Sequence, residues 1–154
     1  MTGAVHANVT AVAVGGRALL ITGAPGSGKS ALALSLIDRG ATLIGDDAVT
    51  LDRQADFLIA GPPPNTAGML EIRNVGIVQM SVTSAPVALV LSLHADAARY
   101  PLEVGTTRLE GVDIPILPFA AGDAAQALRA EYALSLHGLP FPRDGEGSTR
   151  DADG

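Results

Sequence analysis

The residues best suited to chemistry form a glycine-rich segment with the sequence Gly-Ala-Pro-Gly-Ser-Gly-Lys-Ser. The segment matches the P-loop pattern G-x-x-x-x-G-K-[ST] at every fixed position. In a P-loop, backbone N–H groups surround nucleotide phosphates, the lysine reaches the β- and γ-phosphates, and the last hydroxyl ligates Mg²⁺. The predicted nucleotide-binding residues are Gly23, Ala24, Pro25, Gly26, Ser27, Gly28, Lys29 and Ser30.

Lys29 is the only lysine in the chain, because nine of the ten basic residues are arginines. A compact ammonium on a flexible stem differs chemically from a planar guanidinium, so its retention at this position fits a phosphate ligand. The alternative is an ordinary glycine-rich turn. With glycine at about 7% of residues, a chain of this length matches the pattern by chance about once in a few hundred cases. We therefore favour phosphate binding.

The elements around this loop have the order that a P-loop requires. Residues 17–22 (Arg-Ala-Leu-Leu-Ile-Thr) predict a buried strand, and residues 30–39 predict an apolar helix. Gly40 follows the helix at the usual C′ position. A strand, a glycine loop and a helix therefore follow one another, which places the loop at a helix N-terminus, where anions bind.

A second apolar run, residues 41–45, leads directly into Asp46 and Asp47. In an α/β sheet, the strand that follows the P-loop helix ends beside the phosphate loop, because ligands collect at the carboxyl ends of parallel strands. One carboxylate could hold Mg²⁺ and the other could accept a proton from an attacking hydroxyl. The alternative is a solvated turn, which is the commoner explanation of an isolated Asp-Asp pair.

A third segment, residues 70–77 (Leu-Glu-Ile-Arg-Asn-Val-Gly-Ile), is predicted to be short and β-like. Glu71 and Arg73 would then share one face, because residues at i and i+2 do so in a strand. Glu71 on Mg²⁺ and Arg73 on phosphate would suit the site. A solvated surface ion pair is the more frequent explanation of this pattern.

Composition limits the classes of function. The chain has 154 residues, which corresponds to one domain, and its formal charge of −6 argues against binding nucleic acid or an anionic membrane. It has no cysteine, which excludes disulfides and thiolate metal sites. The start of the chain has no secretory signal, and no apolar stretch is long enough to span a bilayer. We therefore expect a cytoplasmic protein.

The predicted fold class is α/β, a single P-loop kinase domain with a mixed β-sheet and flanking helices. Residues 1–142 are expected to form this domain, and residues 143–154, rich in Gly and Asp, are expected to be a disordered tail. Further strands are predicted over residues 48–51, 57–60, 76–82, 87–93 and 112–117, and a second helix over residues 123–136.

Taken together, these motifs resemble the catalytic domain of HPr kinase/phosphorylase, which phosphorylates a serine of the phosphocarrier protein HPr. The resemblance covers about residues 6 to 119, and its sheet is of the type shared with phosphoenolpyruvate carboxykinase. It is carried by His6, the segment 23–30, Arg39-Gly40, Asp46-Asp47, the segment 70–77 and Arg99. Only five residues precede His6, so the chain is similar to the short, alphaproteobacterial form of the family.

The resemblance implies ATP and Mg²⁺ as cofactors, an HPr-like protein as acceptor and a homo-oligomeric enzyme. It implies that Lys29 binds phosphate, that Ser30 and Glu71 ligate Mg²⁺, that Asp47 accepts the proton, and that His6 and Arg99 are accessory catalytic residues. From its place beside Asp47, Asp46 is predicted as a further Mg²⁺ ligand and catalytic residue. The loop linked to dephosphorylation in longer members is not recognisable in residues 118–123. The resemblance therefore does not extend to the phosphorylase activity.

Three other functions would use the same P-loop. A small-molecule kinase would transfer phosphate to a metabolite, and a nucleotide-binding regulator would bind ATP without transfer. A P-loop switch hydrolase would cleave the nucleotide without an acceptor. Only the Glu-Ile-Arg segment favours the protein kinase over these alternatives, and it does so through the family resemblance.

Overall fold

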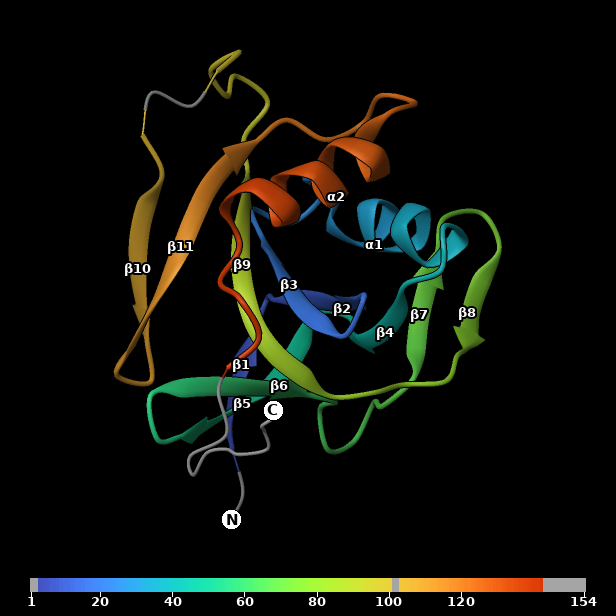
Figure 1. The fold of residues 1–154 in the computed structure, drawn as a ribbon. Helices are drawn as coiled ribbons and strands as arrows, with labels where there is room; N and C mark the ends of the chain where they lie inside the picture. The colour runs from blue at the N-terminus through green and yellow to red at the C-terminus, as the bar shows by residue number, and fades with distance from the viewer. Residues whose placement is uncertain (1–2, 101–102, 143–154) are drawn as a thin grey trace.

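A computed structural model describes residues 3–100 and 103–142 and shows two helices packed on a curled, mixed sheet, with a separate hairpin beside the first helix (Figure 1). The helices of the described residues are α1 (Lys29–Asp38) and α2 (Gln126–His137). The strands are β1 (Ala4–Ala7), β2 (Thr10–Val14), β3 (Arg17–Thr22), β4 (Thr42–Gly45), β5 (Ala48–Gln54), β6 (Phe57–Gly61), β7 (Met69–Ile72), β8 (Gly76–Gln79), β9 (Ala85–Leu93), β10 (Gly105–Leu109) and β11 (Val112–Phe119). The predicted α/β fold class is confirmed.

The strand order along the main path is β1-β5-β6-β9-β3-β2-β4, and β10 and β11 extend the sheet beside β9. β2 is antiparallel to both β3 and β4, so β3 and β4 run in the same direction with β2 between them. Both therefore end at one edge of the sheet. β3 leads there into the glycine-rich loop, and β4 leads there into Asp46 and Asp47.

β9 is the central strand of the sheet. It runs parallel to β3 on one side, and it pairs on the other side with β6 at its start and with β11 at its end. Its sequence is almost entirely apolar, as expected for a strand that is covered on both faces. The prediction of a strand over residues 87–93 is confirmed, and the observed strand begins two residues earlier.

Two hydrophobic clusters lie on opposite faces of this sheet. The first lies between the sheet and the two helices and includes Leu19 and Ile21 of β3 with Leu32 and Leu36 of α1. The second is enclosed by the curl of the sheet and includes Leu20. Successive residues of β3 thus enter different clusters, which follows from the two-residue repeat of a strand. Both helices cover the same face, and they contact each other (Figure 1).

The buried side of α1 gives a test of this packing. We expect Leu36→Ala to lower the free energy of unfolding by about 2–5 kcal/mol, because the leucine is 0% exposed and its loss leaves a cavity. Urea denaturation monitored by circular dichroism measures this change. Leu34→Ala on the same helix is the matched control, because Leu34 is only partly buried. Equal losses in the two variants would contradict the assigned packing.

The observed elements differ from the sequence prediction in several places. β8 ends at Gln79 rather than continuing to residue 82, and Val82 forms an isolated bridge with Leu43. α2 begins at Gln126, three residues later than predicted, because residues 123–125 form a turn held by side-chain contacts. β1, β2 and β10 were not predicted, since β1 and β10 are largely exposed and β2 is built of small residues. The predicted tail, residues 143–154, lies outside the described residues.

The turn before α2 has a pH-dependent contact. Arg129 Nη2 donates a hydrogen bond to Asp123 Oδ1 at 2.8 Å, and this bond lowers the pKa of the Asp123 carboxyl below its ordinary value of 3.8. A carboxyl whose pKa is lowered by folding stabilises the fold above its unfolded pKa, and this contribution is lost as the pH falls through the folded pKa.

No described helix has the length and apolarity needed to cross a membrane.

We therefore expect the Asp123 carboxyl to titrate below pH 3.8 in a carbon-detected NMR titration of the folded protein. In Arg129→Gln the midpoint should move upward, because the charged donor is gone. Asp113, which pairs with Arg108 elsewhere on the surface, is the internal control in the same spectra. An unchanged Asp123 midpoint in the variant would show that Arg129 does not set its pKa.

Candidate active site

The glycine-rich loop joins β3 to α1, and its three glycines, Gly23, Gly26 and Gly28, all adopt positive φ values. Gly28, with φ 105°, is the N-cap of α1 and adopts a left-handed conformation that favours glycine. Gly23 is required for a different reason, because a Cβ there would lie 2.6 Å from Ser27 Oγ. The Ser27 oxygen is buried and has no hydrogen-bond partner among the described residues. A closed loop with an unsatisfied buried hydroxyl fits an anionic ligand with several acceptor oxygens.

Lys29 is the most buried charged residue described, with 9% of its surface exposed. Its Nζ donates hydrogen bonds to the carbonyl oxygens of Gly23 at 2.9 Å and Ala24 at 3.3 Å. The ammonium is therefore folded over its own loop rather than extended into solvent. Carbonyl oxygens accept two of its three N–H donors, and no carboxylate among the described residues pairs with its charge, which favours an anion at the same place.

Asp46 connects the turn after β4 to the phosphate loop. Its Oδ1 accepts a hydrogen bond from Ser30 Oγ at 2.6 Å and a second from Thr10 Oγ1 at 3.0 Å. Ser30 comes from the first turn of α1 and Thr10 from the start of β2, so three elements meet at one carboxylate oxygen. A hydroxyl and a carboxylate are oxygen ligands of the type that Mg²⁺ prefers, so this pair fits a magnesium site.

Asp47 is held next to this pair in an unusual backbone conformation. Its φ is 66°, in the left-handed region, where aspartate and asparagine are the most tolerated residues after glycine. Its N–H donates to Thr10 Oγ1 at 3.1 Å, and its carbonyl accepts the N–H of Asn8 at 2.8 Å. The backbone is thus fixed at both ends while the side chain stays exposed. An exposed, firmly placed carboxylate suits a group that must meet an incoming substrate.

Thr10 was not identified from the sequence, although it is 0% exposed and holds both aspartates. The only signal for it is a polar residue at the beginning of the small apolar run 11–14. Its role depends on β2 lying between β3 and β4, which no local pattern predicts.

The structure does not bring Glu71 into contact with this cluster. Glu71 lies on β7 and is exposed, while its neighbour Leu70 is buried in the hydrophobic cluster between the sheet and α1. Among the described residues, no group of three or more acidic or histidine side chains is arranged to hold a metal. Of the predicted Mg²⁺ ligands, only Ser30 and Asp46 are in contact.

The segment 70–77 is a hairpin rather than one β-like stretch. β7 ends at Ile72, and Arg73 lies in the turn that leads through Asn74, with φ 68°, into β8. The expectation that Glu71 and Arg73 share one strand face is therefore wrong. The physical reason is that Asn74 and the following Gly76 both adopt positive φ values, which reverse the chain.

His6 and Arg99 also lie apart from the phosphate loop. His6 Nε2 is 2.8 Å from Glu110 Oε2, in the turn between β10 and β11, and both side chains are partly exposed. Arg99 lines a pocket beside α2. Neither residue makes a hydrogen bond to the loop or to the aspartates within the described part of the chain. Their accessory catalytic roles stay predictions.

Two polar residues that the sequence did not single out lie at the same sheet edge. Ser92 pairs in register with Thr22, the last residue before the loop, and its Oγ is 3.0 Å from His94 Nε2. The N–H of His94 donates to the carbonyl of Phe119 at 2.9 Å. The end of β9 therefore places an imidazole close to the beginning of the phosphate loop.

Comparison with known proteins finds one family. The profile of the HPr serine kinase C-terminal domain family matches residues 2–85. The HPr kinase/phosphorylase of Clostridium botulinum (strain Eklund 17B / Type B) is 49% identical over 70 residues, which cover 46% of this chain and 23% of that protein. The Clostridium acetobutylicum HPr kinase/phosphorylase is 46% identical over 65 residues, which cover 42% of this chain and 21% of that protein. The match thus spans less than a quarter of the length of these curated relatives.

A solved structure matches over a larger part of the chain. The Hpr(Ser) kinase/phosphatase from Coxiella burnetii superposes with a TM-score of 0.74 at 27% sequence identity. The match covers 87% of this chain and 95% of that one.

Proposed function

The chain belongs to the HPr serine kinase C-terminal domain family, and from this premise we propose that it is a protein-serine kinase acting on an HPr-like phosphocarrier protein. The observation that carries the proposal is the 2.6 Å hydrogen bond from Ser30 to Asp46. It joins the predicted phosphate loop to a turn that also presents Asp47. One edge of the sheet thereby combines groups for binding phosphate, holding a cation and accepting a proton.

We propose ATP as the phosphoryl donor and Mg²⁺ as the metal. The backbone N–H groups of residues 23–30 would surround the β- and γ-phosphates, and Lys29 would exchange its carbonyl partners for phosphate oxygens. Ser30 and Asp46 would hold Mg²⁺, with Glu71 as the further ligand implied by the family. When bound, Mg²⁺ neutralises charge that develops on the transferred phosphoryl group.

Asp47 is proposed to accept the proton of the acceptor serine. Phosphoryl transfer requires mainly the placement and electrostatic stabilisation of the reacting groups, and a carboxylate near the attacking hydroxyl completes the set. The contact between Asp46 and Ser30 favours Asp46 as the metal ligand, which leaves the exposed Asp47 for the acceptor. His6 and Arg99 would assist only if the bound acceptor brings them closer.

We further propose that residues 1–142 form the catalytic domain of a homo-oligomeric enzyme that works in the cytoplasm beside its acceptor. We propose only the transfer of phosphate to the acceptor serine, not the reverse phosphorylase reaction. The turn before α2, where the longer relatives are expected to carry the dephosphorylation loop, is held by contacts of Gln126 and Arg129 with the preceding segment.

Intact-protein mass spectrometry tests the proposal. Purified HPr from the same organism is incubated with this protein, ATP and Mg²⁺, and a gain of one phosphoryl group is expected. An HPr variant with its acceptor serine replaced by alanine is the matched control and should gain nothing, and EDTA should abolish the gain in the parent reaction. ATP binding without any modified HPr would instead favour a metabolite kinase or a binding regulator.

A further inference from the structure

A pocket of about 390 Å³ lies beside α2, apart from the loop that holds Lys29 and Ser30. Its walls come from the end of β11, from α2 and from residues 97–99. The segment 120–122 separates it from the phosphate loop, since Ala120 lines the pocket while Ala121 lies next to Gly28. Its size is within the range of small-molecule sites.

The pocket has an apolar interior. Leu117 and Phe119 of β11 are buried and line it, together with Ala133 of α2. Tyr132 and Leu136 stand at its mouth with 63% and 75% of their surfaces exposed. Large exposed apolar side chains bordering a cavity mark a place where an apolar ligand could cover them.

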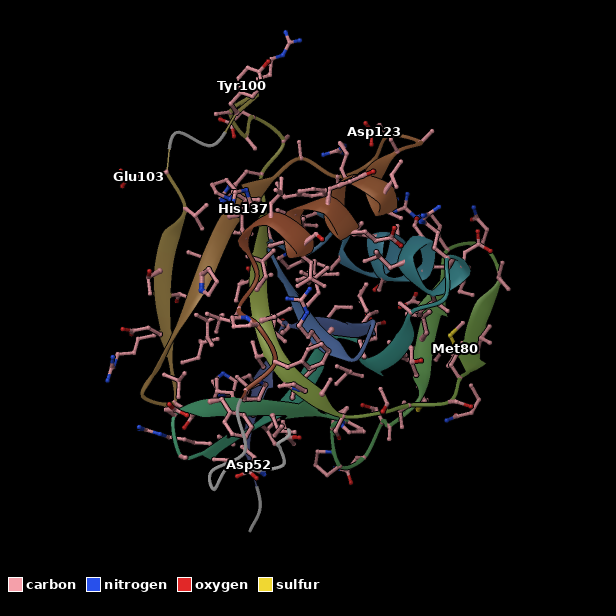
Figure 2. The ribbon with its side chains drawn as sticks, viewed as in Figure 1. Asp52, Met80, Tyr100, Glu103, Asp123 and His137 are labelled. Carbon is pink, nitrogen blue, oxygen red and sulfur yellow. The ribbon has the colours of Figure 1, made fainter. Side chains whose placement is uncertain are left out.

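The titratable side chains that line this pocket, apart from a tyrosine, are all of the cationic type. They are Arg99, Arg129 and His137, and no aspartate or glutamate lines the pocket among the described residues. This contrasts with the whole chain, in which acidic residues outnumber basic ones by 16 to 10. Figure 2 shows His137 at the end of α2 nearest β11, and Asp123 at the other end of the helix.

Arg129 lines the pocket and has a hydrogen-bond donor without a partner among the described residues. Its guanidinium lies over the Phe119 ring, 4.5 Å from the centroid, and only Nη2 makes hydrogen bonds, to Ala120 and Asp123. Its Nε is buried without a partner in the described structure. Since Asp123 pairs with Arg129, the remaining basic side chains that line the pocket are His137 and Arg99, whose guanidinium lies 5.8 Å from the centre of the Tyr100 ring.

We propose that this pocket binds a small amphipathic anion, a carboxylate attached to an aliphatic or aromatic body. The apolar body would cover Leu117, Phe119 and Leu136, and the carboxylate would face Arg99 and His137. Carboxylates pair well with guanidinium groups, and the apolar walls strengthen that pairing by excluding water. Arg99 is also a predicted accessory catalytic residue, but the binding of the anion is measured directly, so its test needs neither ATP nor an acceptor.

Octanoate is the probe, and binding to the full-length protein is followed through the ¹H–¹⁵N NMR shifts of Ala97, Ala98 and Ala133. Shifts at these amides are expected with octanoate and not with its neutral analogue octanamide or with inorganic phosphate. Equal shifts with octanamide would overturn the anionic part of the proposal, and shifts with phosphate alone would overturn the apolar part. No saturable shift with octanoate would overturn the proposal as a whole.

Two leucines on α2 provide a matched pair of variants. Leu136→Glu places a negative charge at the mouth of the pocket and should weaken octanoate binding by about tenfold or more. Leu128→Glu adds the same charge at a 43% exposed leucine outside the pocket and should not weaken it. Arg99→Gln should weaken binding, with Arg73→Gln as its control. Equal weakening by both members of either pair would overturn the assignment to this pocket.

Discussion

Asp47→Asn is expected to lower the rate of phosphoryl transfer by about 10²–10⁴-fold while the affinity for ATP stays unchanged. The amide cannot accept a proton at neutral pH, so the contribution of a general base is lost. The left-handed backbone at residue 47, with φ 66°, suits asparagine as well as aspartate. The Thr10 hydroxyl can still accept the N–H of residue 47. The variant therefore changes the chemistry of the site without straining its fold.

Single-turnover transfer to HPr and calorimetric ATP titration together measure this prediction. Asp38→Asn is the matched control, because Asp38 is an exposed aspartate at the far end of α1. Transfer by Asp47→Asn at the parent rate would exclude Asp47 as the base. A loss of ATP affinity in Asp47→Asn, with transfer otherwise normal, would instead assign Asp47 to the metal.

Lys29→Ala is expected to weaken ATP binding by about 10- to 100-fold and to abolish detectable transfer. Lys29 is only 9% exposed and is the one lysine of the chain, so no second lysine can replace it. Its carbonyl partners, Gly23 and Ala24, belong to the loop itself. Removal of the ammonium should therefore affect the loop locally and leave the sheet intact.

Calorimetry with ATP and Mg²⁺ checks the loss of affinity, and thermal unfolding by circular dichroism checks the fold. Lys29→Arg separates charge from shape, because a planar guanidinium keeps the charge but does not fit the space of a compact ammonium. We expect little recovery of transfer in that variant. Unchanged ATP affinity in Lys29→Ala would count against the phosphate loop, whatever its effect on transfer.

The sequence predicted the strand, loop and helix around Lys29 because their determinants are local. The apolar run 17–22, the glycines and the stop at Gly40 act within one stretch of chain, and each is found where it was expected. The placement of Asp46 beside Ser30 was also predicted, from the rule that parallel strands end at one edge. In both cases a short stretch of sequence was sufficient for the prediction.

Thr10 and Glu71 show why the rest could not be predicted. The role of Thr10 depends on β2 entering the sheet between β3 and β4, which is a matter of long-range pairing. Glu71 was placed near the metal through the family pattern, but its position depends on how the β7–β8 hairpin sits against α1. The contact of His6 with Glu110 depends in the same way on a segment that lies 104 residues further along the chain.

β9 begins where the match to the family profile ends, although the sheet depends on this strand. The family profile ends at residue 85, where β9 begins, yet β9 is the strand that β3, β6 and β11 all pair with. A fragment ending there would expose the edge of β3, a row of unpaired amides beside apolar side chains, and such edges promote aggregation. We therefore expect that residues 2–85, which identify the family, do not fold cooperatively without the second half of the chain.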